Sequence, residues 1–430
     1  MGETFDKFAI ACWVATGFML DNDSFYESVK WDGLKGQPWN YDPKETTLEK
    51  ITADFAQLFE DIVRSQTAGK TALLALSGGL DSRTLAVALR RVGAKVHSYS
   101  YGFEDSFDET SYGKQIAKLA GWSFDDLKIR RGYLWDKIES ACEINLGYAE
   151  FTHPRQLAVA DAMSKKGDIF LLGHWGDVLF DDMGIADDLD FEGQLKAVKK
   201  KILKKGGLEL ASDLWKSWNM EGEFEEIFDK RIRTMLAAIP IENANARIRA
   251  FKSMYWATRW TSTNLSFFSH YAPIALPYYD DRMCQFICSI PEKFLAGRQI
   301  QIEYIRKYAP DMAKVSWQSK APYNLFNHHK YLTNHHLPYR IAMKFKHLYQ
   351  ERVIGKPLVQ RNWELQFLGK KNDKELRRWL FENPELNKLV PSQIIENYYQ
   401  RFTQGNKVHW SHPLSMLLTL GVMLKKTKTL

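Results

Sequence analysis

Apolar and polar positions between residues 46 and 190 predict strands and helices in turn. The segment TTLEKITADFAQLFEDIVRSQ places its apolar side chains on one helical face, and Thr46 with Glu49 forms a capping box at its start. The runs TALLAL, KVHSYSYGF, DDLKI and GDIFLLG are short and strand-like, whereas SRTLAVALRRV and TSYGKQIAKLAGW have helical spacing. Strands separated by helices predict an α/β layer, an open parallel sheet with helices on both faces and right-handed crossovers.

The pattern changes on either side of this segment. Residues 191–430 show helical periods with many aromatic residues, as in ARIRAFKSMYWATRWTSTNLSFFSHY, and predict a mainly helical C-terminal part. Residues 1–45 contain the turn-rich run WDGLKGQPWNYDP and predict an extended lead-in without a core of its own. The chain is therefore expected to divide into residues 1–45, 46–190 and 191–430.

Composition narrows the class of protein. With 45% apolar and 26% charged residues in 430, the chain is an ordinary globular protein, large enough for two or three packed units. Its net charge of +7 favours anionic ligands weakly, and we expect no nucleic-acid partner. The four cysteines form no CxxC pair, which argues against a disulfide framework or a zinc ribbon. No long apolar segment or secretory leader is visible, so we expect no membrane partner and a cytoplasmic protein.

One connection combines glycines, hydroxyls and a carboxylate. In TALLALSGGLDSRTLAVAL the predicted strand ends at Leu76 and the helix begins near Asp81. The intervening glycines permit positive φ angles and let backbone N–H groups converge on an anion at the helix N-terminus. The run matches neither GxxxxGK[ST] nor GxGxxG, and a plain βα turn capped by Ser and Asp is the alternative.

The order SGGLDS resembles the pyrophosphate-binding loop of the ATP pyrophosphatase (PP-loop) family, which includes asparagine, GMP and NAD synthetases. Residues 168–184, DIFLLGHWGDVLFDDMG, resemble the SGxGGDELFGGY segment of the asparagine synthetase branch. Residues 274–294 and 309–326 resemble its PFLDxRLVEFAxSLPxxL and LPxxIxxRxKxGF segments, and the lead-in resembles the end of its glutaminase domain. Four ordered matches identify the chain as an asparagine synthetase-like protein with an adenine nucleotide alpha hydrolase-like fold.

The resemblance implies a role for individual residues. It assigns ATP and pyrophosphate binding to the loop and to one later glycine: Ser77, Gly78, Gly79, Asp81, Ser82 and Gly173. Magnesium is assigned to Asp81 and Asp177, for which helix capping is the alternative. Lys320 occupies the position of the catalytic lysine, whose ammonium would stabilise charge at the α-phosphate.

Other positions stay open at this stage. His174 would act as a base toward an attacking ammonium, or would bond a turn carbonyl. Asp280 and Arg282 would contact substrate or form a structural ion pair. Val178 and the pair Asp181–Asp182 depart from the DELFGG pattern, which puts the substrate in doubt more than the use of ATP.

The implied function is an ATP-dependent amide-forming ligase. It would adenylate aspartate or a related acid, release pyrophosphate, and transfer ammonia or an amine, with ATP and Mg²⁺ as cofactors. Residue 2 is Gly rather than the nucleophilic Cys of a glutaminase domain, so nitrogen is expected from ammonia, an amine substrate or a separate glutaminase. A tRNA-thiolating activity is disfavoured because no cysteine lies near the loop, and a catalytically weak nucleotide-binding subunit is the other alternative.

Two further clusters have a functional and a plain interpretation. The pairs His328–His329 and His335–His336 suggest a metal site or a surface decorated with histidines. The basic stretch from Lys344 to Arg378 suggests contact with an acidic partner or a solvated helical face. In both clusters the second interpretation is favoured.

Overall fold

A parallel sheet lies at the centre of one lobe of the protein. The computed structural model describes residues 4–32, 39–106, 110–152, 155–352 and 359–427. Within them, the sheet has the strand order β3-β2-β1-β4-β5, and every pairing is parallel. The strands are β1 (Thr71–Ala75), β2 (Lys95–Phe103), β3 (Ser123–Ile129), β4 (Ile169–Leu171) and β5 (Ile274–Ala275). The open parallel sheet expected from the sequence is confirmed.

Helices cover both faces of this sheet, as predicted. On one face α2, α3 and α15 pack on one another, and α4 packs on β2 and β3. On the other face lies α12, where the ring of Phe268 is 4.9 Å from that of Phe170 in β4. These helices are α2 (Leu48–Thr67), α3 (Leu80–Arg91), α4 (Ser111–Ala120), α12 (Ser262–Ser269) and α15 (Gln299–Tyr308).

Two local details differ from the sequence prediction. Thr47, not Thr46, caps α2, because its backbone is extended and its hydroxyl accepts from the N–H of Lys50 at 3.2 Å. The fifth strand pairs Ile274 and Ala275 with β4, although two residues carry no period that could predict it. The sheet therefore contains strands from both of the segments, residues 46–190 and 191–430, that the sequence analysis separates.

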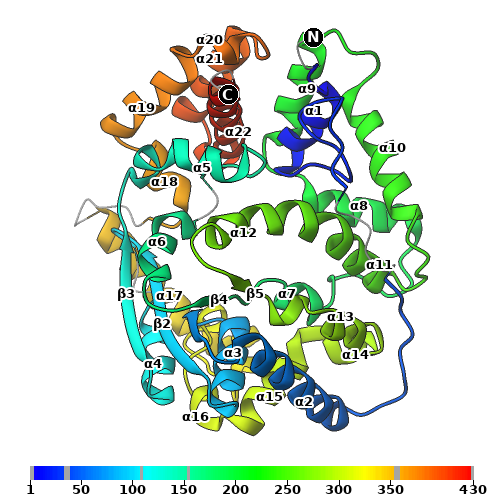
Figure 1. Ribbon diagram of the computed structural model, residues 1–430, viewed down its shortest axis with the longest axis vertical. Coiled ribbons are helices and arrows are strands. Elements are labelled where there is room, and N and C mark those ends of the chain that lie inside the picture. The colour runs from blue at the N-terminus through cyan, green and yellow to red at the C-terminus, as the bar shows by residue number, and fades with distance from the viewer. Residues whose placement is uncertain (1–3, 33–38, 107–109, 153–154, 353–358, 428–430) are drawn as a thin grey trace.

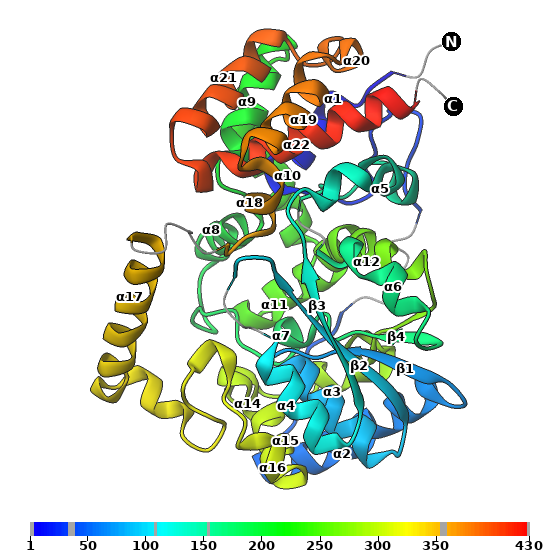
Figure 2. The same ribbon diagram turned by 90° about the vertical axis from the view of Figure 1, so that its left-hand side faces the viewer.

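The second lobe is helical and includes the start of the chain (Figure 2). Helix α1 is buried from Ala9 to Thr16 and packs along α9, so this part of the lead-in is a core helix and not an extended segment. A helix that is apolar on all sides is stable only when surrounded. The lobe contains α1 (Lys7–Thr16), α8 (Phe191–Ile202), α9 (Gly207–Ser217), α10 (Phe224–Ala237), α18 (Asn362–Phe367), α19 (Lys370–Phe381), α20 (Pro384–Asn387), α21 (Ser392–Gln404) and α22 (Lys407–Thr427).

The rest of the chain adds a π-helix, further α-helices and several 3₁₀ turns. A π-helix, Lys252–Thr261, connects α11 directly to α12. The other helices are α5 (Ile138–Asn145), α6 (Ala160–Ser164), α7 (Gly176–Leu179), α11 (Ala244–Phe251), α13 (Asp281–Cys288), α14 (Glu292–Leu295), α16 (Pro310–Ala313) and α17 (Leu337–Arg352). Single 3₁₀ turns occur at Tyr133–Asp136, Arg155–Ala158, Pro277–Tyr279, Ala296–Arg298, Gln318–Lys320, His328–Leu332 and Asn334–His336.

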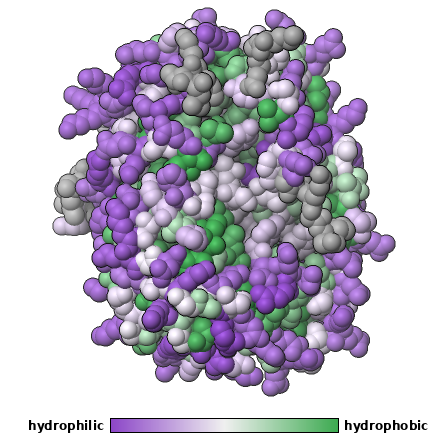
Figure 3. Space-filling view, viewed as in Figure 1, coloured by the Kyte–Doolittle hydropathy of each residue, from purple (hydrophilic) through white to green (hydrophobic). Residues whose placement is uncertain are grey.

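The face of the molecule seen in Figure 3 is mostly hydrophilic. Figure 3 shows hydrophilic side chains over much of one face, with paler and hydrophobic ones gathered near its centre. Among the helices that the structure describes, none is both long and apolar enough to cross a membrane.

Candidate functional site

A cavity of about 670 Å³ opens at the carboxyl ends of β1, β2 and β4. Strand β1 lies between β2 and β4, and the chain passes from β3 at one edge to β4 on the other side of β1. The strand order thus reverses beside β1, and ligands of open α/β sheets bind in the crevice at such a point. The predicted SGGLDS loop enters the cavity from this position.

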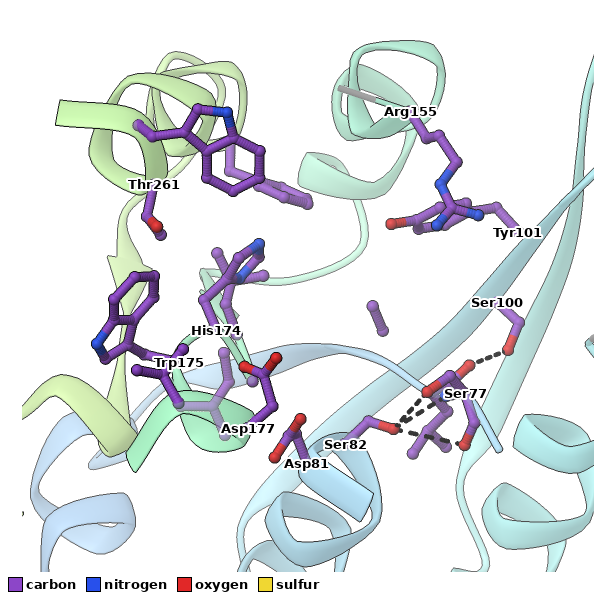
Figure 4. Close-up of a pocket in the computed structure, with 18 of the residues that line it drawn as sticks. Ser77, Asp81, Ser82, Ser100, Tyr101, Arg155, His174, Trp175, Asp177 and Thr261 are labelled. Atoms are coloured by element: carbon purple, nitrogen blue, oxygen red, sulfur yellow. Dashed lines mark hydrogen bonds between the residues drawn. The ribbon is translucent and has the colours of Figure 1, made fainter. Parts of the chain in front are cut away.

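The loop presents hydroxyl and amide groups at the start of a helix. Gly79 is the N-cap of α3 and offers no side-chain cap, so the first N–H groups of that helix are available to an anion. The hydroxyls of Ser77 and Ser82 lie 3.0 Å apart, and the hydroxyl of Ser82 accepts from the N–H of Ser77 at 3.1 Å (Figure 4). Ser77 and Ser82 both line the cavity. The arrangement suits a phosphate group.

The two loop glycines are required for closeness rather than for positive φ. Gly79 has a φ of −81°, and neither glycine lies in the left-handed region. A Cβ on Gly78 would stand 2.5 Å from the Cβ of Gln318 and 2.9 Å from the ring of Tyr112. Neither residue uses the positive φ that glycine permits, because the turn needs a missing side chain and not an unusual backbone.

Gln318 and Arg83 hold the loop against a distant segment. The N–H of Gly78 donates to Oε1 of Gln318 at 3.2 Å, and the N–H of Gln318 donates to the carbonyl of Gly78 at 3.0 Å. Arg83 is fully buried and donates to the carbonyls of Val315 and Ser316, both at 2.8 Å, and to that of Gly78 at 3.1 Å. Sequence reasoning missed both residues, although an arginine among apolar residues on a buried helix was a usable signal.

The two predicted metal ligands meet on the floor of the cavity. Asp81 is in the first turn of α3, and Asp177 is in the first turn of α7 (Figure 4). A Cβ on Gly176 would collide with the carboxylate of Asp81, and one on Gly173 would come 3.1 Å from the Cβ of Asp81. Glycine at both positions therefore lets the second motif approach the first.

Asp81 also has partners that sequence reasoning did not find. Arg298 forms an ion pair with its Oδ1 atom, and Nε2 of Gln301 donates to the same oxygen at 3.1 Å. Burial raises the pKa of Asp81, Arg298 opposes that shift, and the charge of Asp177 adds to it. The carboxylate is thus held by a cation at the place where a divalent ion is expected.

His174 lines the middle of the cavity. Its Nδ1 atom is buried, with no hydrogen-bond partner among the described residues. Burial lowers the pKa of His174 to about 4, against a smaller opposing effect of Asp177. The imidazole is therefore neutral near pH 7, and this pKa makes it a weak base toward an ammonium ion.

The remaining walls bring charged and aromatic side chains into the cavity. In Figure 4, Arg155 and Tyr101 lie on one side of the cavity, and Trp175 and Thr261 lie on the other. Lys252, Trp256 and Trp260 project from the π-helix and complete the second side. None of these seven residues was predicted from the sequence.

Most of the chain, across both lobes, matches one protein family. Residues 54–392 match the family described as asparagine synthase. The chain belongs to the asparagine synthase family. This family comprises ATP-dependent synthetases, so the protein is a ligase-type enzyme.

Other comparisons add little to this assignment. The NMN synthetase from Francisella tularensis is 11% identical in sequence, with a TM-score of 0.25 over 54% of this chain and 98% of its own. No curated protein sequence matches the chain.

Asparagine synthase family members use ATP and typically Mg²⁺, and the two aspartates fit such an ion. Magnesium in nucleotide sites binds one or two carboxylates and completes its octahedral shell with phosphate oxygens and water. Asp81 and Asp177 approach from two adjacent helix starts, and Asp177 is exposed to the cavity. Across the described part of the chain, no three His, Cys, Asp or Glu side chains form a metal cluster, so phosphate oxygens would complete the set.

Lys320, which the sequence resemblance places at the family's lysine position, does not line the cavity. Its ammonium lies 4.5 Å from the ring centre of Tyr331 and 5.9 Å from that of Trp317. Gln318, two residues earlier in the same 3₁₀ turn, does line the cavity and is bonded to the loop. The predicted catalytic role of Lys320 stays a prediction.

Asp280 and Arg282 form an ion pair with each other. Nε and Nη2 of Arg282 donate to the two carboxylate oxygens of Asp280 at 2.9 and 3.0 Å, and Nε2 of Gln66 donates at 3.2 Å. Arg282 lowers the pKa of Asp280. Neither residue lines the cavity, so the structural alternative holds for this pair.

The histidine pairs and the basic stretch lie away from the cavity. Nδ1 of His328 is 2.9 Å from the carbonyl of Leu325, and the ring of His336 packs 4.3 Å from that of Tyr331. No described cluster of metal-binding side chains includes them. Residues 353–358 of the basic stretch lie outside the described residues.

Proposed function

We propose that the protein adenylates a carboxylic acid with ATP and transfers the acyl group to ammonia or an amine, releasing pyrophosphate and then AMP. One observation carries this proposal. The loop from Ser77 to Ser82, which includes Asp81, lies at the start of α3 and faces the same cavity as Asp177. A triphosphate bound there would have its β- and γ-phosphates on the loop and its α-phosphate toward the rest of the cavity.

In the first step a carboxylate oxygen of the acid attacks the α-phosphorus. The bond from that phosphorus to the bridging oxygen breaks, and the electron pair leaves with pyrophosphate. The hydroxyls of Ser77 and Ser82 and the N–H groups at the start of α3 would stabilise the charge on the leaving group. Magnesium, when bound, supplies positive charge opposite the phosphate oxygens at Asp81 and Asp177.

In the second step a neutral amine attacks the acyl carbon, and AMP leaves with the electron pair of the acyl C–O bond. The nitrogen loses one proton to solvent water or to the departing AMP phosphate as the amide forms. His174 is neutral near pH 7 and would orient the amine, since a pKa of about 4 disfavours full proton transfer to it. Lys320 would balance charge on the tetrahedral carbon if its turn moved toward the cavity.

The nitrogen donor is open to three sources: free ammonia, an amine on the substrate itself, or ammonia from a separate glutaminase. The cavity favours none of them.

Acid-dependent release of pyrophosphate and AMP from ATP tests the proposal. We expect equal amounts of the two products with a competent acid, and loss of at least a hundredfold in rate in Asp81→Asn and Asp177→Asn. Asp182→Asn is the matched control, because Asp182 is a nearby carboxylate that does not line the cavity. Release of ADP and phosphate in place of AMP and pyrophosphate would overturn the adenylation step.

A second candidate is a nucleotide-binding subunit with little catalysis. Two observations favour it: Arg298 places a cation on Asp81, and Lys320 lies outside the cavity. ATP binding by calorimetry, with no turnover for any acid or amine, would support this candidate over the ligase.

A further inference from the structure

We propose that the acyl subsite, defined by Trp175, Lys252, Trp256 and Trp260, accepts a carboxylic acid with a bulky aromatic or apolar body and no free ammonium group. This inference rests on the proposed adenylation for its chemistry and adds the class of acid. It would make aspartate a poor substrate. Three features of these residues support it.

The first feature is the backbone of Trp175. Its φ is 78° and its ψ is −5°, the left-handed region that favours glycine and disfavours bulky residues. The SGxGGDELF pattern to which this segment was matched has glycine at this position. Strain of this kind persists where the surrounding structure holds it, and it gathers at functional sites. Here it places a large indole, which donates to Oγ of Ser253 at 3.0 Å, on the cavity wall.

The second feature is the π-helix that carries the other three residues. Its wider turns place residues roughly four or five positions apart on one face. Lys252, Trp256 and Trp260 follow that spacing, and all three line the cavity. The rings of Trp256 and Trp260 meet edge to face, with centroids 5.8 Å apart. Stretches of π-helix are frequently found at functional sites, and this one builds an aromatic wall.

The third feature is the sign of the charges at this wall. The Lys252 ammonium lies 4.9 Å from the ring centre of Trp256 and 5.8 Å from that of Trp175. Lys204 lies 5.6 Å from Trp256 and 5.7 Å from Trp260. Both lysines therefore lie at the indole rings, and Lys252 lines the cavity at a position where a substrate ammonium could otherwise bind.

A free amino acid fits this subsite poorly. The α-ammonium of aspartate would face Lys252, and Asp177 is the carboxylate that lines this part of the cavity within the described residues. Asp177 is also assigned to magnesium, so it cannot serve as the anchor of an ammonium. A substrate carboxylate, in contrast, would pair with Lys252, and an aromatic body would pack against the indole rings.

Pyrophosphate release with a panel of acids tests the subsite directly. The panel pairs 3-phenylpropionate and N-acetylphenylalanine with succinate and aspartate, at fixed ATP and Mg²⁺. We expect at least tenfold higher kcat/KM for the two aromatic acids. In Trp175→Gly and Trp260→Leu we expect KM for the aromatic acids to rise at least tenfold, and KM for ATP to change less than threefold. Trp218→Leu is the control, because its indole is half-buried outside the cavity and donates to the Leu389 carbonyl at 2.7 Å.

The outcomes separate this inference from the proposed function. Fastest release with aspartate would overturn the aromatic subsite and leave the ligase proposal standing. No release with any acid would count against the ligase proposal, and saturation-transfer NMR with 3-phenylpropionate would then decide the subsite. Binding that is lost in Trp260→Leu and kept in Trp218→Leu would support it, and absence of binding would overturn it. Thermal unfolding of each variant shows whether Trp175→Gly is folded, and Trp260→Leu tests the subsite independently.

Discussion

The Arg298 guanidinium donates to the Asp81 carboxylate, which is the group that the resemblance of the SGGLDS loop to its family assigns to magnesium. The two residues are 217 positions apart in the chain, and they meet because α15 packs on α3. Burial raises the pKa of Asp81, and this ion pair opposes that rise because the guanidinium favours the charged form of the carboxylate.

Removal of this cation should move the acidic limb of the pH profile. In Arg298→Gln the pKa of Asp81 rises further, so its carboxylate is protonated at a higher pH. We expect the lower apparent pKa of kcat/KM for ATP to increase by about 1 or more. The profile is measured between pH 5 and pH 9 at saturating Mg²⁺. Arg306→Gln, in the helix α15 that follows Arg298 and paired with Glu303 at 2.5 Å, should leave it unchanged. An unshifted acidic limb in Arg298→Gln would show that Asp81 does not set it.

Added bulk in the loop should separate it from Gln318. Gly78→Ala introduces a Cβ that would lie 2.5 Å from the Cβ of Gln318, and overpacking of this kind costs about 1–3 kcal/mol. We expect that loss in the free energy of unfolding by urea, together with at least a tenfold rise in KM for ATP. Gly102→Ala is the control, since its Cβ would meet Thr110 at an ordinary 3.5 Å. Equal KM values for the two variants would contradict a loop shaped by this contact.

His174 should contribute to the pH dependence of stability. Its pKa is about 4 in the folded protein and about 6.5 when unfolded, so the unfolded state binds the extra proton between these values. Stability from this residue is complete above pH 6.5 and is lost as the pH falls toward 4, by about 2–3 kcal/mol.

Urea unfolding at pH 7 and pH 4.5 measures this contribution. The decrease in the free energy of unfolding between these pH values should be smaller in His174→Gln than in the native protein. His409→Gln, which removes a histidine paired with Glu209 at the surface, should keep most of the native decrease. An identical decrease in all three proteins would mean that His174 titrates normally.

Lys320 should affect catalysis and not nucleotide affinity. If its turn moves to bring the ammonium to the α-phosphate, Lys320→Ala should lower kcat by about 10²–10³. The Kd for ATP, measured by calorimetry, should stay within threefold, because the loop itself is intact. Lys314→Ala removes an exposed lysine six residues earlier and should have no effect on either quantity. A kcat near the native value in Lys320→Ala would contradict the catalytic role that the resemblance of residues 309–326 implies for Lys320.

Local patterns of apolar and polar residues predict much of the fold. The strand β2 covers the run KVHSYSYGF, and α4 lies within TSYGKQIAKLAGW, because their periods are set by neighbouring residues. The two-residue strand β5 has no such period, and its pairing with β4 depends on the packing of the preceding helix α12 against the sheet. The lead-in helix α1 was missed for a similar reason, since its uniform apolarity gains meaning only from α9 beside it.

The residues of the candidate site likewise fall into those that short motifs predict and those that only tertiary packing brings together. The sequence by itself determined the residues of the loop and the pairing of Asp81 with Asp177, since both lie in short motifs at the ends of adjacent strands. Only the tertiary structure decided that Arg298 contacts Asp81, that Lys320 lies outside the cavity, and that Trp175 shares a wall with the π-helix. Motif residues depend on local backbone geometry, which a few neighbours specify. The walls of the cavity depend on how helices far apart in the chain pack, and no local period records that.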